Sequence, residues 1–371
     1  MTSTEKLFLA LYRSALWDTP VDEKLLQSDV DWEQLMDMAT KQTIMGVITD
    51  AVTKLPKSLR PPKTIYYNLV MYTSNIEKRN NEMNAYTPMV MKSLKEKGSD
   101  TFLLKGQGLS MYYPNPLHRQ SGDIDLFVGF DLEYFRKTCE NMKSIASSVE
   151  EVKDDKQHGA FTYKEVCVEI HGTIHSFISK KCAAELRSWC VDRLKGEPVV
   201  FHSRLGDIKM PPRNFDALYV FIHLATHYMG GGVGLRQITD WMMYLHKNYN
   251  EIDIEMLKND IQRLGIEKVW RVFGTMAVNE FGFPANEMPF YDDKVSKKST
   301  ILLRHIFKTG NFGAVQKEKH LSSKSNKYLK KFVTFIGQIP IYIHNLRVFP
   351  SETAYCFVEF IKDAFVEMKR K

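Results

Sequence analysis

Two aspartates lie one residue apart in the apolar stretch GDIDL, residues 122–126. In an extended strand, successive side chains point to opposite faces, so Asp123 and Asp125 share one face and Ile124 and Leu126 share the other. Two carboxylates this close repel each other unless a cation lies between them. Hard oxygen ligands at this spacing suit Mg²⁺, with Mn²⁺ as the alternative. The stretch therefore predicts a strand that carries a divalent metal site.

Chain length and cysteine content set the broad class. A chain of 371 residues is long for one core, so we expect two or three subdomains. The five cysteines are scattered without a CxxC pair, which is typical of a reducing cytoplasm rather than of a disulfide framework. The N-terminal stretch lacks the cleavage site of a signal peptide, and no apolar run reaches the roughly 18 residues of a membrane span. These features predict a cytoplasmic protein without a transmembrane span.

Most of the positive charge lies at one end of the chain. The formal net charge is +7, and residues 314–371 contain 11 Lys or Arg against 5 Asp or Glu. One interpretation is a surface for an anionic partner, such as nucleic acid, a membrane surface or a phosphorylated substrate. The other is a solvated helix face.

The spacing of apolar residues predicts a small α/β segment between helical regions. The expected strands are 101–104, 123–128, 148–153, 160–163, 166–171 and a hairpin of 199–201 with 208–210. The expected helices are 5–17, 31–55, 64–97, 107–113, 132–144, 180–193, 214–229, 236–249, 253–264, 266–281, 298–308, about 328–346 and 351–369. This pattern predicts an α+β fold with a mixed-sheet core at 99–212, an N-terminal helical region at 1–98 and a C-terminal helical region with the basic tail at 213–371.

A third carboxylate, Glu169, lies on the alternating stretch 166–171. If this strand pairs beside the strand of Asp123 and Asp125, three carboxylates converge. Two aspartates can hold metal ions that bridge the phosphates of a nucleotide, and the third acidic group can complete the second metal site or act as a base. Each motif alone is weak, because DxD occurs in many surface loops and a lone strand glutamate is usually solvated. Together they predict a metal–nucleotide site.

Several residues near the aspartates are candidates for phosphate binding. Lys105 and the small Gly106 follow a predicted strand end, where the backbone can approach a phosphate. Arg119, Ser121 and the Gly122 amide lie just before the aspartates, where they are placed to contact a triphosphate.

Histidines and a second arginine complete the set of candidates. His223 and His227 are i, i+4 on a predicted helix, and without a third ligand they favour a pocket-lining or structural pair over a zinc site. His171 shares a face with Glu169 and is placed to orient it or to contact the nucleotide. For Arg236 two alternatives stay open, which are pairing with Asp240 at i, i+4 and reaching a phosphate.

These motifs resemble the nucleotidyltransferase superfamily, whose core has a glycine turn at a strand end, a [DE]h[DE] strand (h, hydrophobic) and a third acidic strand residue. More narrowly, residues 75–245 are similar to the bacterial uncharacterised nucleotidyltransferase-like family. The counterparts of its signature are Leu104-Lys105-Gly106, Tyr113-Pro114, Arg119, residues 122–126, Glu169-Ile170-His171, His223, His227, Gly234-Leu235-Arg236-Gln237 and Asp240. The superfamily turn hG[GS] is replaced here by Lys105-Gly106-Gln107. The resemblance implies a polymerase-beta-like core that binds an NTP.

Two functions follow as hypotheses. In the first, Asp123, Asp125 and Glu169 catalyse Mg²⁺-dependent transfer of a nucleoside monophosphate from an NTP to a hydroxyl or phosphate acceptor. In the second, the same fold is a non-catalytic module that binds a nucleotide or a partner protein. The resemblance implies the reaction type and leaves the acceptor open.

Overall fold

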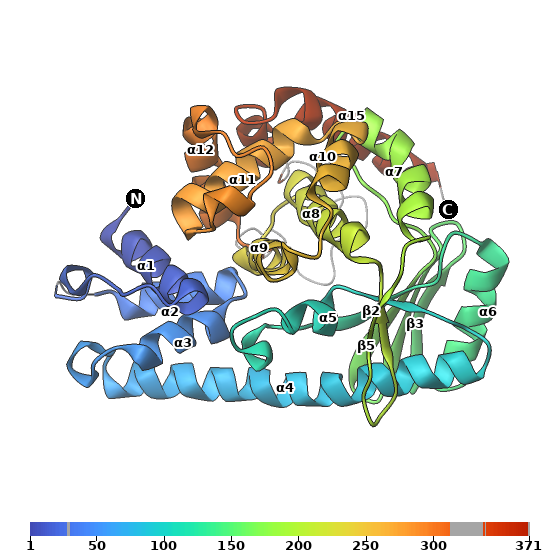
Figure 1. The fold of residues 1–371 in the computed structure, drawn as a ribbon, viewed down its shortest axis with the longest axis horizontal. Coiled ribbons are helices and arrows are strands. Elements are labelled where there is room, and N and C mark those ends of the chain that lie inside the picture. Colours follow the sequence, from blue (N-terminus) through green and yellow to red (C-terminus); the bar gives the residue numbers. More distant parts are fainter. Residues whose placement is uncertain (28–29, 312–336, 338, 370–371) are drawn as a thin grey trace.

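The computed structural model describes residues 1–27, 30–311, 337 and 339–369. A small β-sheet lies beside a larger body of helices, and the long helix α4 (Lys63–Glu96) runs along one side of both (Figure 1). The sheet is mixed and helices flank it in the chain on both sides. The predicted α+β fold class is therefore confirmed.

The helices before α4 are α1 (Ser3–Trp17), α2 (Trp32–Lys41) and α3 (Met45–Lys54), with short 3₁₀ turns at Glu23–Leu25 and Lys57–Leu59. The prediction of a single helix over 31–55 is wrong, because the chain breaks between α2 and α3, where Thr43 has a φ of 54°. The side chain of Gln42 occupies this break. It donates to the carbonyl of Ile306 (2.9 Å) and accepts from the N–H of Leu235 (3.1 Å). Through these two hydrogen bonds, Gln42 connects the N-terminal helices to the C-terminal ones.

The sheet contains β1 (Phe102–Leu104), β2 (Asp123–Phe127), β3 (Ser148–Lys153), β4 (His158–Tyr163) and β5 (Val166–His171). Its order is β1-β2-β5-β4-β3, and the β2–β5 pair is parallel while the other pairs are antiparallel. Helices α5 (Gly106–Ser110) and α6 (Leu132–Lys143) follow β1 and β2, with a 3₁₀ turn at Pro116–His118 between α5 and β2. Ile124 and Leu126 are fully buried, as the alternation predicts.

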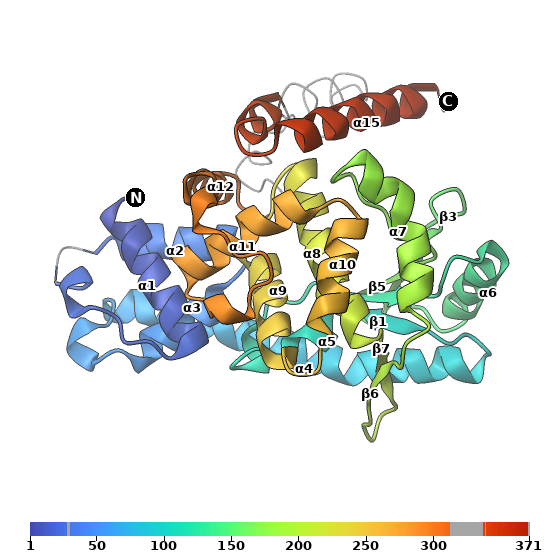
Figure 2. The ribbon, with the colours of Figure 1, turned by 45° about the horizontal axis from the view of Figure 1, so that its top comes forward.

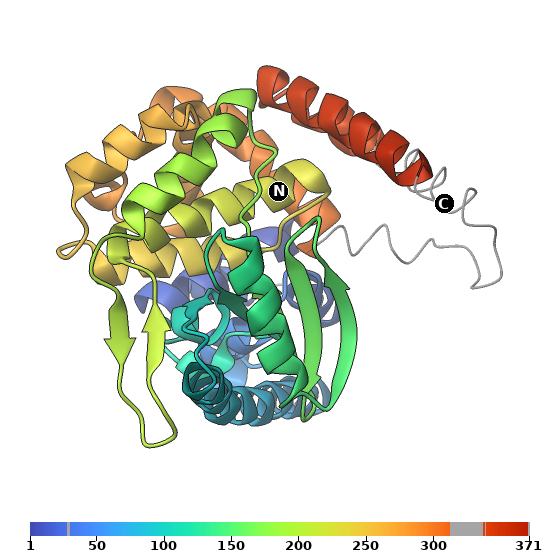
Figure 3. The same ribbon diagram turned by 90° about the vertical axis from the view of Figure 1, so that its right-hand side faces the viewer.

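The C-terminal half adds helices and one hairpin. They are α7 (Lys180–Arg193), β6 (Val199–Phe201), β7 (Ile208–Met210), α8 (Arg213–Gly230), α9 (Leu235–Asn248), α10 (Ile254–Arg263), α11 (Glu267–Phe281), α12 (Ser296–Thr309) and α15 (Pro350–Lys369), with 3₁₀ turns at Ala285–Glu287 and Asp293–Val295. The β6–β7 hairpin projects from the body beside α4 (Figure 3), and α15 lies along the outer side of α7 and α8 (Figure 2). Among the described helices none is long and apolar enough to cross a membrane.

Two clusters of buried side chains form the core. The smaller cluster packs β2, β4 and β5 against α6 and the second half of α4. The larger cluster contains side chains from α1–α3 and from α7–α12 together, so both helical regions contribute to it. A buried hydrogen bond of 2.5 Å between the hydroxyls of Tyr12 and Thr239 joins them as well. The division at residues 98 and 212 stays a prediction. Residues 314–336, 338, 370 and 371 of the predicted basic tail, with eight of its 11 Lys and Arg, lie outside the described residues.

Asp216, in the first turn of α8, is a buried carboxyl group. Its side chain is 1% exposed, and neither oxygen accepts a hydrogen bond from the described residues. Burial raises the pKa of Asp216 well above its ordinary value, because the charged form is poorly solvated there.

Replacing Asp216 with asparagine is therefore expected to stabilise the fold at neutral pH. A group with a raised folded-state pKa contributes stability below its unfolded pKa and loses it as the pH rises through the folded pKa. Each unit by which burial raises the pKa of Asp216 corresponds to about 1.4 kcal/mol, so we expect a gain in stability at about pH 7 that disappears near pH 4. Urea unfolding at both pH values measures the gain. The exposed Asp37→Asn on α2 is the control, and a loss of stability in Asp216→Asn at neutral pH would contradict this account.

Candidate active site

The three predicted carboxylates converge on one face of the β2–β5 pair. The parallel register places Asp125 beside Glu169 and Asp123 beside Cys167. Oxygen atoms of Asp123, Asp125 and Glu169 lie within 4.8 Å of one another. Because the two strands are adjacent in the sheet, the alternation of each strand brings its acidic side chains to the same face.

The turn after β1 brings Lys105 onto this group. The Lys105 ammonium lies 3.2 Å from Asp125 Oδ1 and 3.5 Å from His223 Nε2. Lys105 has a φ of 53° and Gly106 a φ of 49°, and a Cβ on Gly106 would lie 3.4 Å from the carbonyl of Asp123. A lysine in this region of φ/ψ space costs about 1–3 kcal/mol, and such strain concentrates at functional sites.

The pKa values of the three carboxyl groups are shifted in different directions. The charge of Asp125, followed by burial, raises the pKa of Asp123. Burial alone would raise the pKa of Asp125, but Lys105 and the hydrogen bond from His171 outweigh it and lower that pKa. Hydrogen bonds from His158 and His171 hold the pKa of Glu169 far below its usual range. Asp123 is thus the carboxylate whose charge is least compensated by the protein.

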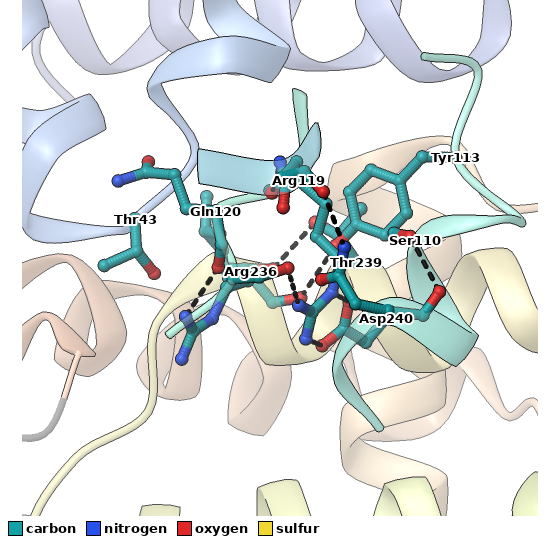
Figure 4. A network of polar contacts seen from close by, with 12 residues as sticks. Thr43, Ser110, Tyr113, Arg119, Gln120, Arg236, Thr239 and Asp240 are labelled. Carbon is teal, nitrogen blue, oxygen red and sulfur yellow. Dashed lines mark hydrogen bonds and ion pairs between the residues drawn. The ribbon is translucent and has the colours of Figure 1, made fainter. Parts of the chain in front are cut away.

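Arg119 is held by a buried network rather than directed freely into the site (Figure 4). Its Nε and Nη2 donate to the two oxygens of Asp240 at 2.7 and 2.8 Å, and Nη1 donates to Ser121 Oγ at 2.9 Å. The Tyr113 hydroxyl donates to the same Asp240 at 2.7 Å. All three guanidinium nitrogens therefore donate to protein groups, which favours positioning of the chain before β2 over direct phosphate contact.

Arg236, in the first turn of α9, makes fewer hydrogen bonds to the described residues than Arg119 does. Its Nη1 donates to the carbonyl of Gln120 at 2.7 Å, and its Nε has no hydrogen-bond partner among the described residues. Asp240 pairs with Arg119, so the alternative in which Arg236 and Asp240 form an ion pair is not seen in the described part of the chain. Arg236 lines the same cavity as Asp123 and Asp125, which makes it a candidate for contact with an anionic ligand.

His223 and His227 lie one turn apart on α8, with ring centroids 4.3 Å apart. Burial and the charge of Lys105 lower the pKa of both rings, to about 4 for His227. Both imidazoles are therefore neutral at physiological pH. Both line the cavity, as the pocket-lining alternative predicts.

His171 and His158 flank Glu169. The Nε2 of His171 donates to Asp125 Oδ1 at 2.9 Å and lies 3.3 Å from Glu169 Oε2. The Nε2 of His158 lies 3.3 Å from the same Glu169 oxygen. Sequence reasoning missed His158, because the strand was expected to begin at residue 160. The cross-strand partner of His158 is His171, a relation that only the pairing of β4 with β5 reveals.

A cavity of about 500 Å³ lies among the site residues. Its lining contains all the predicted site residues except Ser121, namely Asp123, Asp125, Glu169, Lys105, Gly106, Arg119, Gly122, His171, His223, His227, Arg236 and Asp240. Gln237, named above only as part of the family signature, and Asn311 also line it and were not among the predicted site residues. The Gln237 side chain donates to Asn311 Oδ1 at 2.7 Å. Ser121 instead faces a smaller hollow beside α4.

The donor set fits a divalent cation. Three carboxylates with oxygens within 4.8 Å of one another are the hard ligands that Mg²⁺ and Mn²⁺ prefer. The raised pKa of Asp123 also favours a cation at this position, because a cation would remove the repulsion from Asp125 that raises this pKa.

Comparison with protein families gives one match. The family model described as an uncharacterised nucleotidyltransferase matches residues 28–282. No curated protein and no solved structure matches the chain. The matched range contains every residue of the cavity lining except Asn311.

Proposed function

The chain belongs to the uncharacterised nucleotidyltransferase family, and we propose that it transfers a nucleoside monophosphate from an NTP to a hydroxyl or phosphate acceptor. The observation that carries this proposal is the convergence of Asp123, Asp125 and Glu169 on adjacent parallel strands at the wall of one cavity. Phosphoryl chemistry needs positioning and charge neutralisation above all, and this geometry supplies both.

Asp123 and Asp125 would hold the divalent ion, which supplies the positive charge that neutralises the nucleotide phosphates. Lys105 and Arg236 offer two further cationic groups on the cavity wall, at opposite sides of the aspartates in the chain. Both would bind phosphate oxygens by charge-assisted hydrogen bonds. Arg119 and Asp240 hold in place the residues that lead into β2.

Glu169 suits a ligand role better than that of a general base. Its pKa is held low by hydrogen bonds from His158 and His171, so it accepts a proton poorly at neutral pH. As an ionised carboxylate it adds a permanent negative charge to the cation site.

The proposal predicts Mg²⁺-dependent nucleotide binding. Calorimetric titration of the full chain with ATP, CTP, GTP and UTP, with Mg²⁺ and with EDTA, measures it. In Asp125→Asn we expect the Mg²⁺-dependent part of the affinity to fall about 100-fold, because hydrogen bonds and ion pairs to charged groups are worth about 1.5–3 kcal/mol each. Asp37→Asn, an exposed residue on α2, should bind as the wild type does.

Two outcomes would change the conclusion. If none of the four nucleotides binds, or if EDTA has no effect on binding, the proposal is rejected. If nucleotides bind with Mg²⁺ but no pyrophosphate is released with any acceptor class, the non-catalytic binding module is the correct alternative. Thermal melting of each variant checks that the fold is intact.

A further inference from the structure

A second group of possible metal ligands lies beside the three carboxylates. The Nε2 atoms of His158 and His171 and a carboxylate oxygen of Glu169 lie within 4.8 Å of one another. Both Nε2 atoms approach the same oxygen, Glu169 Oε2, at 3.3 Å. The side chains are between about a fifth and a third exposed, so an ion from solution can reach them.

The sheet register builds this group. His158 and His171 are directly opposite each other on antiparallel β4 and β5, and Ala160 is opposite Glu169. Residues two apart on a strand share a face, so His171 and Glu169 project on the side where His158 meets them. The two imidazole rings lie with centroids 5.2 Å apart and tilted by 56°, which directs both toward Glu169 rather than stacking them.

We infer that His158, Glu169 and His171 form a metal site of their own, which binds a borderline divalent ion such as Zn²⁺ in preference to Mg²⁺. In a tetrahedral site with bonds of about 2.0–2.1 Å, two ligand atoms lie about 3.3–3.4 Å apart. Each of the two Nε2 atoms already lies 3.3 Å from Glu169 Oε2. Two imidazoles and one carboxylate leave at least one coordination position open, as in catalytic rather than structural sites.

The ligand set separates this site from the carboxylate site. Asp123 and Asp125 contribute oxygen alone, whereas this group contributes two nitrogens, and imidazole favours Zn²⁺ and related ions over Mg²⁺. Glu169 belongs to both groups and can bridge two ions, as carboxylates do in two-metal sites. His171 Nε2 donates to Asp125 Oδ1 at 2.9 Å in the metal-free site, so an ion bound at this nitrogen would take the place of that proton. The role of this ion in nucleotidyl transfer rests on the proposed function, but its binding does not.

The competing explanation is an ion-pair cluster in which both imidazoles simply donate to Glu169. Such a cluster would need no ion and would bind Zn²⁺ no better than other surface histidines do. His202, on the β6–β7 hairpin, provides the comparison, because its exposed imidazole lies 2.9 Å from Asp207.

Zinc titration of the full chain tests the inference. Calorimetry with Zn²⁺, in excess Mg²⁺ and without nucleotide, should give one site per chain. His158→Gln should weaken it at least about tenfold, since even residues that only support metal ligands cost 10–100-fold. His202→Gln and Asp123→Asn should keep it. With Co²⁺ in place of Zn²⁺, the visible absorption of the wild type should report nitrogen ligands, and that signal should be lost in His158→Gln.

The alternatives give different results. The metal site is rejected if the wild type binds no Zn²⁺ under excess Mg²⁺, or if His158→Gln binds it as tightly as the wild type. It is also rejected if Asp123→Asn abolishes Zn²⁺ binding, because the ion would then lie on the aspartates. If His158→Gln fails to fold, His171→Gln serves the same comparison. Nucleotide binding with Mg²⁺ is measured on the same wild-type sample. Absence of nucleotide binding by the wild type rejects the proposed function and leaves the zinc result unaffected.

Discussion

Replacing Arg119 with methionine is expected to lower the free energy of unfolding by about 3–5 kcal/mol, the usual cost of removing one partner of a buried ion pair. The pair with Asp240 is only about 5–6% exposed on either side, and both guanidinium bonds to the carboxylate would be lost. Asp240 would keep its hydrogen bond from Tyr113 but not its compensating charge. Urea unfolding followed by circular dichroism measures the change.

The matched control is Arg136→Met. Arg136 pairs with Asp154 at 2.9 Å, but both side chains are about half exposed, and such pairs contribute about 0–1 kcal/mol. The double variant Arg119→Met/Asp240→Leu should recover much of the lost stability, because no buried charge is left behind. If Arg119→Met loses no more free energy of unfolding than Arg136→Met does, the buried pair does not hold in place the residues that lead into β2.

Replacing Asp123 with asparagine is expected to reduce pyrophosphate release from the bound NTP by about 10³-fold, because a lost cation ligand removes several kcal/mol of charge stabilisation. Asp123 is the natural choice, since it makes no ion pair with the described residues and the charge of Asp125 raises its pKa. Its removal therefore leaves no buried cation unpaired. A coupled assay for pyrophosphate, with water as the default acceptor, measures the rate.

Two further variants separate a role in cation binding from a role in folding. Asp123→Glu keeps the carboxylate and should retain part of the activity. Asp37→Asn changes the same side chain far from the cavity and should retain all of it. An Asp123→Asn protein that melts like the wild type and releases pyrophosphate at the same rate would remove the carboxylates from the mechanism.

The strands carrying the carboxylates could be predicted because alternation is a local property. The run of residues 166–171 shows it, and its even positions are fully buried in the structure. The pairing of strands is not local, so the sequence could not establish that β2 and β5 are neighbours. The convergence of the carboxylates was predicted only for the case in which these strands pair. His158 was missed because the strand was expected to begin at residue 160, and its position beside His171 depends on the pairing of β4 with β5.

Long-range partners account for the other differences. Arg119 and Asp240 are 121 residues apart, so nothing in the sequence between them indicates that they pair. The helical spacing of Arg236 and Asp240 pointed to a local alternative that the structure does not use. The break at Gln42 likewise depends on Ile306 and Leu235, which lie far along the chain.

The parallel pairing of β2 with β5 also has a kinetic consequence. His171 and Asp125 are 46 residues apart, and the Arg119–Asp240 pair closes a far longer loop. Loop closure is unfavourable until such distant contacts form, so structures that depend on them fold slowly. The cation site should therefore be among the last features to form during refolding. Mg²⁺ or nucleotide added early should leave the refolding rate unchanged and slow only the unfolding rate, because neither ligand has a completed site to bind before the rate-limiting step.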